Sequence, residues 1–298
     1  MKLALYRFFS LASAVLLSAL VAAGPAHAQS TMVRLHTTQG PMDIKLLDSE
    51  APITVANFLA YVRGGNYTNS MVHRSARNLN GTSFVIQGGG YIWPEGPTCC
   101  SLVTSRGQIQ NEFSPTRSNV RGTIAMAKVG DQPNSATSQW FVNMGNNTFL
   151  DSSNGGFTVF GRLTTPGMEL ADRIGALPRL TYLNPPFNEL PVTVARSSGG
   201  PARSEAILVT AATEVPAPAT ASDSIFNYIE AKYPTYLAPV ASSSGEYLGY
   251  QFRHYAQFNV YIAIGDGRVL YYAPLVSGDY VDIGPVDYWT NVATTEGY

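Results

Sequence analysis

Two short blocks of this sequence place polar side chains among aromatic ones. The first joins VHR at residues 72–74 to FVIQGGG at 84–90, and the second runs from residue 121 to 161. Among their polar side chains are the guanidinium of Arg74 and the amides of Gln87 and Gln139. A guanidinium stays charged at any relevant pH and presents its donors in a rigid fork. The blocks therefore supply an apolar surface with a permanent hydrogen-bond donor.

Other kinds of catalytic site have little support. The glycine run at 88–90 lacks the Lys and Ser/Thr of a phosphate-binding loop, and there is no G-x-S-x-G motif of a serine hydrolase. Outside residues 1–28 the histidines are His36, His73 and His254, without the close spacing of metal ligands. We expect no metal and no cofactor.

The elements that must position these residues are mostly short strands. Alternating apolar residues predict a hairpin over residues 33–46. A helix is predicted from Pro52, with apolar residues at helical spacing up to Val62 and a stop at the following glycines. Further strands are predicted at 84–87, 122–127, 139–144, 158–163 and 207–210, the last returning to pair with the first, and a second helix at 167–174. Many short strands with two helices predict a closed antiparallel barrel whose ends the helices cover.

The order of the motifs is more specific than any one of them. It reads HR at 73–74, FxxQGGG at 84–90, AMA at 125–127, SQxF at 138–141, FLD at 149–151 and VFG at 159–161. On these motifs, residues 31–211 resemble the cyclophilin-type peptidyl-prolyl cis/trans isomerases. The resemblance implies a mainly β fold, a closed antiparallel eight-stranded barrel capped by two helices. It also implies isomerase (rotamase) activity on X–Pro bonds during protein folding.

The resemblance gives each matching residue a role. Arg74 would be the catalytic guanidinium that weakens the resonance of the prolyl amide, and Gln87 would hold Arg74 or the substrate carbonyl. The proline pocket would be formed by Phe84, Val85, Phe141 and Leu150, with Phe157 closing one side and Phe149 at the rim. The groove for the residue before proline would be bordered by Ala127, Lys128 and Gln139. Taken singly, Arg74 is also typical of a solvated surface, and Phe84, Ile86 and Phe141 are also typical of a barrel core.

Three departures from the family pattern affect the expected activity. The segment 75–83 is longer than usual and lacks proline, so it could displace Phe84. Val85 replaces the usual Met, and Phe149 stands where many relatives have Trp, which predicts weaker binding of cyclosporin-type macrocycles. The insertion keeps an alternative open: a non-catalytic binding or chaperone module for proline-containing segments, with the C-terminal region contacting a partner.

The N-terminus predicts export. Residues 1–28 have a basic start, an apolar run and AHA at 26–28, as in a secretory signal peptide. The run is short for a membrane anchor, which takes about 20 residues. We expect cleavage after Ala28, no membrane span in the mature chain, and a periplasmic or secreted protein that acts on exported polypeptides. No run of Lys or Arg indicates nucleic-acid binding. The adjacent Cys99 and Cys100 are expected in a surface loop, free or joined to each other.

The chain divides by composition. After the signal peptide we expect an isomerase-like domain at 29–212, a Pro/Ala-rich linker at 213–222 and a small Tyr-rich α+β domain at 223–298. In the last, Ser222 or Asp223 is predicted to cap a helix, and strands are predicted at 247–255, 260–264 and 269–272, the last two joined by a tight turn. Its tyrosines would fill a core, or form an aromatic face for a peptide or glycan.

Overall fold

The computed structural model describes residues 30–96, 99–182, 186–196, 199–235, 237, 241–273 and 279–298. The predicted signal peptide, residues 1–28, lies outside this range. Among the described residues, no helix is long and apolar enough to cross a membrane.

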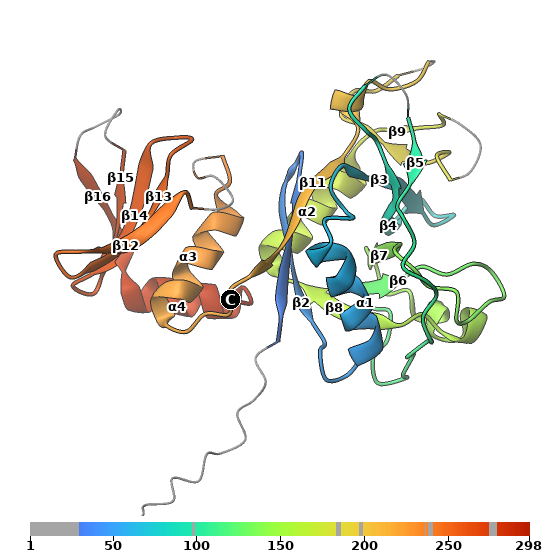
Figure 1. Cartoon of the computed structure of the whole chain (residues 1–298), viewed down its shortest axis with the longest axis horizontal. Coiled ribbons are helices and arrows are strands. Elements are labelled where there is room, and N and C mark those ends of the chain that lie inside the picture. The colour runs from blue at the N-terminus through green and yellow to red at the C-terminus, as the bar shows by residue number, and fades with distance from the viewer. Residues whose placement is uncertain are drawn as a thin grey trace, which may run out of the picture.

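Eight antiparallel strands close into a barrel, as predicted (Figure 1). They are β1 (Met32–Thr37), β2 (Gly40–Leu46), β3 (Ser70–Arg77), β4 (Ser83–Ile92), β6 (Thr123–Met126), β7 (Trp140–Asn143), β8 (Val159–Leu163) and β11 (Leu208–Val215). The order around the barrel is β3-β11-β1-β2-β8-β6-β7-β4, and β4 pairs with β3 to close it. The predicted return of the last strand to the first is the β1–β11 pair. Three shorter strands lie outside the ring: β5 (Ser101–Leu102), which pairs with β4, and β9 (Arg179–Leu180) with β10 (Leu190–Pro191).

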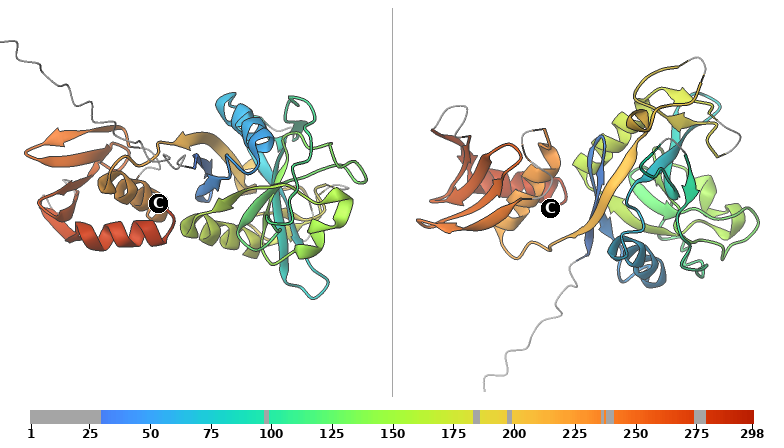
Figure 2. Two further views of the ribbon diagram at one scale, coloured as in Figure 1. Left: turned by 90° about the horizontal axis from the view of Figure 1, so that it is seen from below. Right: turned by 45° about the horizontal axis from the view of Figure 1, so that its top comes forward.

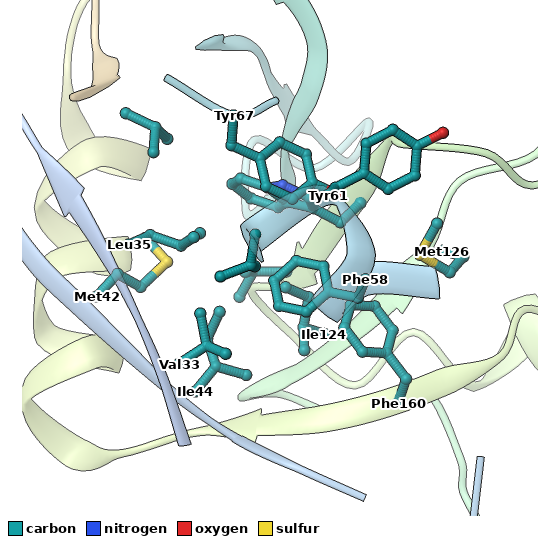
Figure 3. Packing of buried hydrophobic residues seen from close by; sticks show 14 of the residues in the cluster. Val33, Leu35, Met42, Ile44, Phe58, Tyr61, Tyr67, Ile124, Met126 and Phe160 are labelled. Carbon is teal, nitrogen blue, oxygen red and sulfur yellow. The ribbon is translucent and has the colours of Figure 1, made fainter. Parts of the chain in front are cut away.

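Both predicted helices of the barrel domain are present, as α1 (Pro52–Arg63) and α2 (Thr165–Ala176). The Glu112 carboxylate accepts hydrogen bonds from the first backbone N–H groups of α1, which are otherwise unpaired at a helix start. At α2 the Thr164 hydroxyl caps the helix by accepting from the Gly167 N–H. Phe58 of α1 packs against Phe160 of β8, with ring centroids 5.0 Å apart, in the core between helix and barrel (Figure 3).

The C-terminal unit is a five-stranded antiparallel sheet with two helices on one face. In chain order it comprises α3 (Ala221–Lys232), β12 (Ser243–Tyr247), β13 (Tyr250–Tyr255), β14 (Val260–Gly265), β15 (Arg268–Tyr272), β16 (Tyr280–Pro285) and α4 (Val286–Thr295). The tight turn between β14 and β15 was predicted, but β16 and α4 were not. The helix cap is Thr220, not Ser222 or Asp223. The predicted strand 247–255 is confirmed for Tyr250–Tyr255, which form β13, but a turn at 248–249 separates Tyr247, which belongs to β12.

The segment between the two units is shorter than the expected linker. Strand β11 runs to Val215 and α3 begins at Ala221, so residues 216–220 alone connect them. Val215 and Met32 are buried in the same apolar cluster as α3 and the C-terminal sheet. The C-terminal unit therefore packs directly on the β1, β2 and β11 side of the barrel (Figure 2).

Candidate active site

Arg74, Gln87 and Gln139 form a chain of hydrogen bonds on the barrel surface. Arg74 and Gln87 are paired across β3 and β4. Arg74 Nη1 donates to Gln87 Oε1 at 3.5 Å, and Gln87 Nε2 donates to Gln139 Oε1 at 2.9 Å. Both amide oxygens thus accept a hydrogen bond within this chain, Gln87 Oε1 from Arg74 and Gln139 Oε1 from Gln87. In the described part of the chain, the Gln139 amide N–H groups and Arg74 Nη2 have no partner, so they can donate to a bound molecule.

Glu189 holds Arg74 from the other side and was missed by the sequence reasoning. Arg74 Nε donates to Glu189 Oε2 at 2.9 Å, and the Ser75 N–H donates to the Glu189 carbonyl at 2.8 Å. The second carboxylate oxygen lies 3.5 Å from Arg179 Nη1. The two side chains of the Arg74–Glu189 pair are 35% and 22% exposed, so the ion pair is partly shielded from water. The separation of 115 residues leaves no local signal that could have indicated it.

The predicted apolar pocket residues come together in one cluster beside this chain. Gln87 lies opposite Phe141 in the β4–β7 pair, which joins the polar and apolar parts. The cluster contains six of the predicted residues: Phe84, Val85, Ala127, Phe141, Leu150 and Phe157. It is separate from the main barrel core, which includes Ile86. The core interpretation is therefore correct for Ile86, whereas Phe141 is buried in this second cluster and Phe84 is partly buried against it.

Aromatic contacts set the shape of the cluster. The rings of Phe141 and Phe157 meet edge to face at 5.6 Å, and those of Phe84 and Phe149 stack at 5.5 Å. Phe149 is 55% exposed, and its expected place at the rim of a proline pocket remains a prediction. This exposed ring, stacked on the partly buried Phe84 of the cluster, leaves apolar surface open to a ligand.

Lys128 is held by the protein itself. Its Nζ donates to the carbonyls of Asn154 at 2.8 Å and Gly156 at 2.5 Å, and lies 4.6 Å from the Phe157 ring centroid. Burial lowers its pKa. The ammonium group therefore braces the loop before Phe157, and its predicted place at the groove remains a prediction.

A buried network of asparagines supports the cluster from behind. Asn147 Nδ2 donates to Asn143 Oδ1 and to the Phe84 carbonyl, both at 2.9 Å. Asn143 in turn donates to Asn119 at 3.1 Å, and the Asn119 backbone N–H donates to Asp151 Oδ1 at 2.9 Å. Satisfied buried networks of this kind are rigid. They fix the backbone of Phe84 and the turn η1 (Thr148–Asp151) that carries the aromatic rim.

The insertion at 75–83 lengthens a hairpin. Strands β3 and β4 continue past the site, with Ala76 paired to Val85. The tip is closed by a hydrogen bond from the Asn78 N–H to the Thr82 carbonyl at 2.8 Å. Phe84 keeps its contacts with the apolar cluster and with Phe149. The extra residues therefore extend away from the pocket side chains.

Glycines 88–90 allow close packing under the site. A Cβ atom on Gly88 would lie 2.6 Å from the Trp140 ring, and one on Gly90 would lie 2.6 Å from Gln139 Cδ. Both distances are too short for real contacts, so Gly88 makes room for the Trp140 ring and Gly90 makes room for the Gln139 side chain.

Cys99 and Cys100 are joined to each other as an adjacent pair and pack beside Met71.

The barrel domain is similar to known proteins. Residues 32–195 match the model of a family described as cyclophilin type peptidyl-prolyl cis-trans isomerase/CLD. A peptidyl-prolyl cis-trans isomerase of Acinetobacter baylyi is 39% identical over 160 residues, covering 53% of this chain and 79% of the relative. Peptidyl-prolyl cis-trans isomerase B of Escherichia coli is 40% identical over 148 residues, covering 48% and 83%. A solved cyclophilin-type isomerase of Cryptosporidium parvum is 23% identical, with a TM-score of 0.46, covering 63% of this chain and 99% of that one.

Proposed function

Because the chain belongs to the cyclophilin-type peptidyl-prolyl cis/trans isomerase family, we propose that it accelerates X–Pro bond rotation in exported polypeptides. The observation that carries this proposal is the Arg74–Gln87–Gln139 chain beside the apolar cluster that contains Phe141 and Phe157. The first supplies hydrogen-bond donors, and the second supplies a surface for a proline ring.

The reaction needs little more than these two features. Amide resonance gives the prolyl C–N bond its rotational barrier of about 18–20 kcal/mol. Arg74 Nη2 donates toward the prolyl nitrogen, which localises the nitrogen lone pair and weakens the resonance. The Gln139 amide donates to the substrate carbonyl oxygen, while the apolar cluster holds the ring. Donors positioned in advance lower a barrier by several kcal/mol because they need no reorganisation during the reaction.

Export is the second part of the proposal. The predicted signal peptide at 1–28 supports export of the mature chain to the periplasm or to the outside of the cell. Uncatalysed X–Pro isomerisation takes tens to hundreds of seconds and can limit folding. The substrates would therefore be unfolded or partly folded exported proteins with non-native prolyl isomers.

The test measures cis-to-trans conversion of a short X–Pro peptide by purified residues 29–298. Arg74→Ala should lower kcat/KM by about 100-fold or more, as loss of a transition-state donor does. Arg63→Ala is the matched control, since Arg63 forms an exposed ion pair with Glu214 away from the site. An Arg74→Ala variant as active as the wild type would refute the assignment of Arg74.

One observation favours the non-catalytic alternative, a module that binds proline-containing segments without turning them over. The charge of Arg74 is already partly balanced by Glu189. A well-folded wild type that binds an X–Pro peptide without accelerating its isomerisation would favour this function over catalysis.

A further inference from the structure

The C-terminal sheet has two different faces. One face packs on α3 and α4, where Ile225 and Ile229 meet Ile262 and Val269 in a buried cluster. These helices lie on the side of the sheet toward the barrel (Figure 1). The opposite face is rich in tyrosine. Within the described part of the chain, no helix or further strand packs on it.

An aromatic ladder crosses four strands of this outer face. The strand register places His254, Tyr261, Tyr272 and Tyr280 directly opposite one another. The His254 and Tyr261 rings stack at 4.2 Å, and the Tyr272 and Tyr280 rings stack at 4.6 Å. Tyr280 is 62% exposed. Cross-strand aromatic pairs stabilise a sheet, but this ladder presents its ring faces and edges to solvent.

A trough runs beside the ladder. Its floor includes Ala263 and Leu270, and its far wall includes Tyr247 and Tyr250. The register puts Gly245 and Gly265 on the same face, which leaves room for the flanking rings. The cavity volume is about 810 Å³, within the range of roughly 300–1,000 Å³ of ligand sites.

The hydroxyl groups around the trough are largely unused. Among the described residues, the hydroxyls of Tyr247, Tyr261, Tyr272 and Tyr280 have no hydrogen-bond partner, whereas Tyr250 donates to Asp266 at 2.8 Å. The trough therefore offers ring surfaces together with several free O–H donors. It suits a ligand that has apolar rings and unpaired carbonyl oxygens.

The charge of this unit is negative. Residues 221–298 contain eight acidic and three basic side chains, a net charge of −5. All three bases, Lys232, Arg253 and Arg268, are bound in ion pairs. At the trough, Glu246 lines the wall and Asp266 lies behind Tyr250. A cationic ligand is therefore favoured, and a Lys or Arg can also lie over a tyrosine face.

We propose that the trough binds an extended, proline-rich peptide segment that carries Lys or Arg beside its prolines. Such segments adopt the polyproline II conformation, in which the backbone makes no internal hydrogen bonds and its carbonyls remain free to accept. Aromatic-lined grooves bind these segments by packing tyrosine rings against proline rings. The free tyrosine hydroxyls donate to the carbonyls, and Glu246 attracts the base. This site is separate from the barrel site, and its binding does not depend on catalysis there.

A neutral glycan also stacks on tyrosine rings, but it gains nothing from Glu246 or from the negative charge of the unit. The charge therefore favours the peptide, and a glycan is an outcome of the test.

The test measures fluorescence anisotropy of a labelled peptide of repeated Pro-Pro-Lys units with residues 29–298. The double variant Tyr272→Ser/Tyr280→Ser removes the stacked pair at the trough, and Tyr288→Ser is its control, because Tyr288 is an exposed tyrosine on α4. We expect the double variant to weaken binding about tenfold or more, as loss of hot-spot aromatics does. Tyr288→Ser should bind like the wild type.

Charge and ligand class are tested with the same assay. Glu246→Lys should weaken binding severalfold, and peptides of Gly-Gly-Lys or Pro-Pro-Glu units should bind at least tenfold more weakly than Pro-Pro-Lys. The single change Glu246→Lys, at an exposed side chain, also covers the case in which the double variant fails to fold. Equal binding by the folded double variant, or binding of an N-acetylglucosamine oligomer in place of the peptide, would overturn the proposal.

Discussion

Arg34 and Asp43 form a bidentate ion pair across β1 and β2, and both side chains are shielded from solvent. Arg34 Nε donates to Asp43 Oδ1 and Arg34 Nη2 donates to Asp43 Oδ2, each at 2.7 Å. The side chains are 3% and 0% exposed. Asp43 also accepts from the Tyr298 hydroxyl at 2.7 Å. The pair lies on the outer surface of the barrel, so its burial results from the C-terminal unit.

Helix α3 completes this charged cluster. Glu230 Oε2 lies 3.4 Å from Arg34 Nη1, and the Asn227 carbonyl accepts from Arg34 Nη2 at 3.0 Å. Glu230 also accepts from Arg253 and from the Tyr255 hydroxyl, each at 3.0 Å. Each buried charge therefore has several partners, which is the condition under which buried ions are tolerated.

Removing Glu230 should destabilise the protein. Glu230→Ala leaves Arg34 and Arg253 with less compensation in a buried place, and we expect a loss of about 3 kcal/mol in the free energy of unfolding. Urea denaturation followed by circular dichroism measures it. Glu169→Ala is the control, because its ion pair with Lys232 also joins the two units but is exposed, and such pairs contribute about 0–1 kcal/mol. Equal losses in the two variants would contradict the prediction.

Glu189 should position Arg74 for catalysis. In Glu189→Ala the guanidinium loses its Nε anchor, and we expect kcat/KM for an X–Pro peptide to fall about tenfold because misplaced catalytic groups lose rate steeply. Arg179→Ala removes the other ion pair of Glu189 and should change kcat/KM little. A rise in kcat/KM in Glu189→Ala would show instead that the carboxylate restrains the charge of Arg74.

Two buried histidines should make stability depend on pH. Burial lowers the pKa of His73 to about 4, and burial with the charge of Arg34 does the same to His36. An unfolded chain takes up these protons below about pH 6.5. The stability they provide is therefore present above that pH and is lost as the pH falls toward 4.

The expected loss between pH 7 and pH 5 is roughly 2 kcal/mol for each histidine. Urea denaturation at the two pH values measures it. His73→Leu should reduce the pH dependence by about half, whatever its own effect on stability. An unchanged difference between pH 7 and pH 5 in this variant would exclude His73 as a source.

The exposed ring of Phe149 should limit the affinity for cyclosporin-type macrocycles. Phe149→Trp enlarges the ring at the rim of the apolar cluster and adds an indole N–H donor. We expect binding of cyclosporin A to become about tenfold tighter, measured by calorimetry. Leu102→Trp adds a tryptophan at a position that is also exposed, on β5, and should leave the affinity unchanged. An unaltered affinity in Phe149→Trp would show that this ring does not limit binding.

The barrel, and the grouping of most candidate site residues, could be predicted because their signals are local; the roles of these residues remain predictions. Apolar alternation, turn glycines and the proline at the start of α1 are readable within a few residues. The motif order then placed Gln87 and Phe141 in strands that the structure pairs directly. The Glu189–Arg74 ion pair could not be predicted in this way, because it depends on how a distant loop packs.

The C-terminal unit was predicted less well for physical reasons. The turn between β12 and β13 uses Leu248 at φ 50°, a conformation that usually marks Gly or Asn, so the sequence gives a weak turn signal. The alternation of apolar and polar residues predicted strand β1, but it did not predict what covers the face that carries Arg34 and His36. Arg34 and His36 are buried because α3 and β11 approach from outside the hairpin.

The shared burial of Arg34, Asp43 and Met32 limits how far the two units are interchangeable modules. A gene truncated after β11 would still encode every barrel strand, but the protein would expose an ion pair and an apolar patch that its own strands do not cover. The change in composition after residue 212 thus does not separate two units that could each unfold independently, because they share a buried interface. Grafting this C-terminal unit onto another cyclophilin would require transferring the outward residues of β1 and β2 with it.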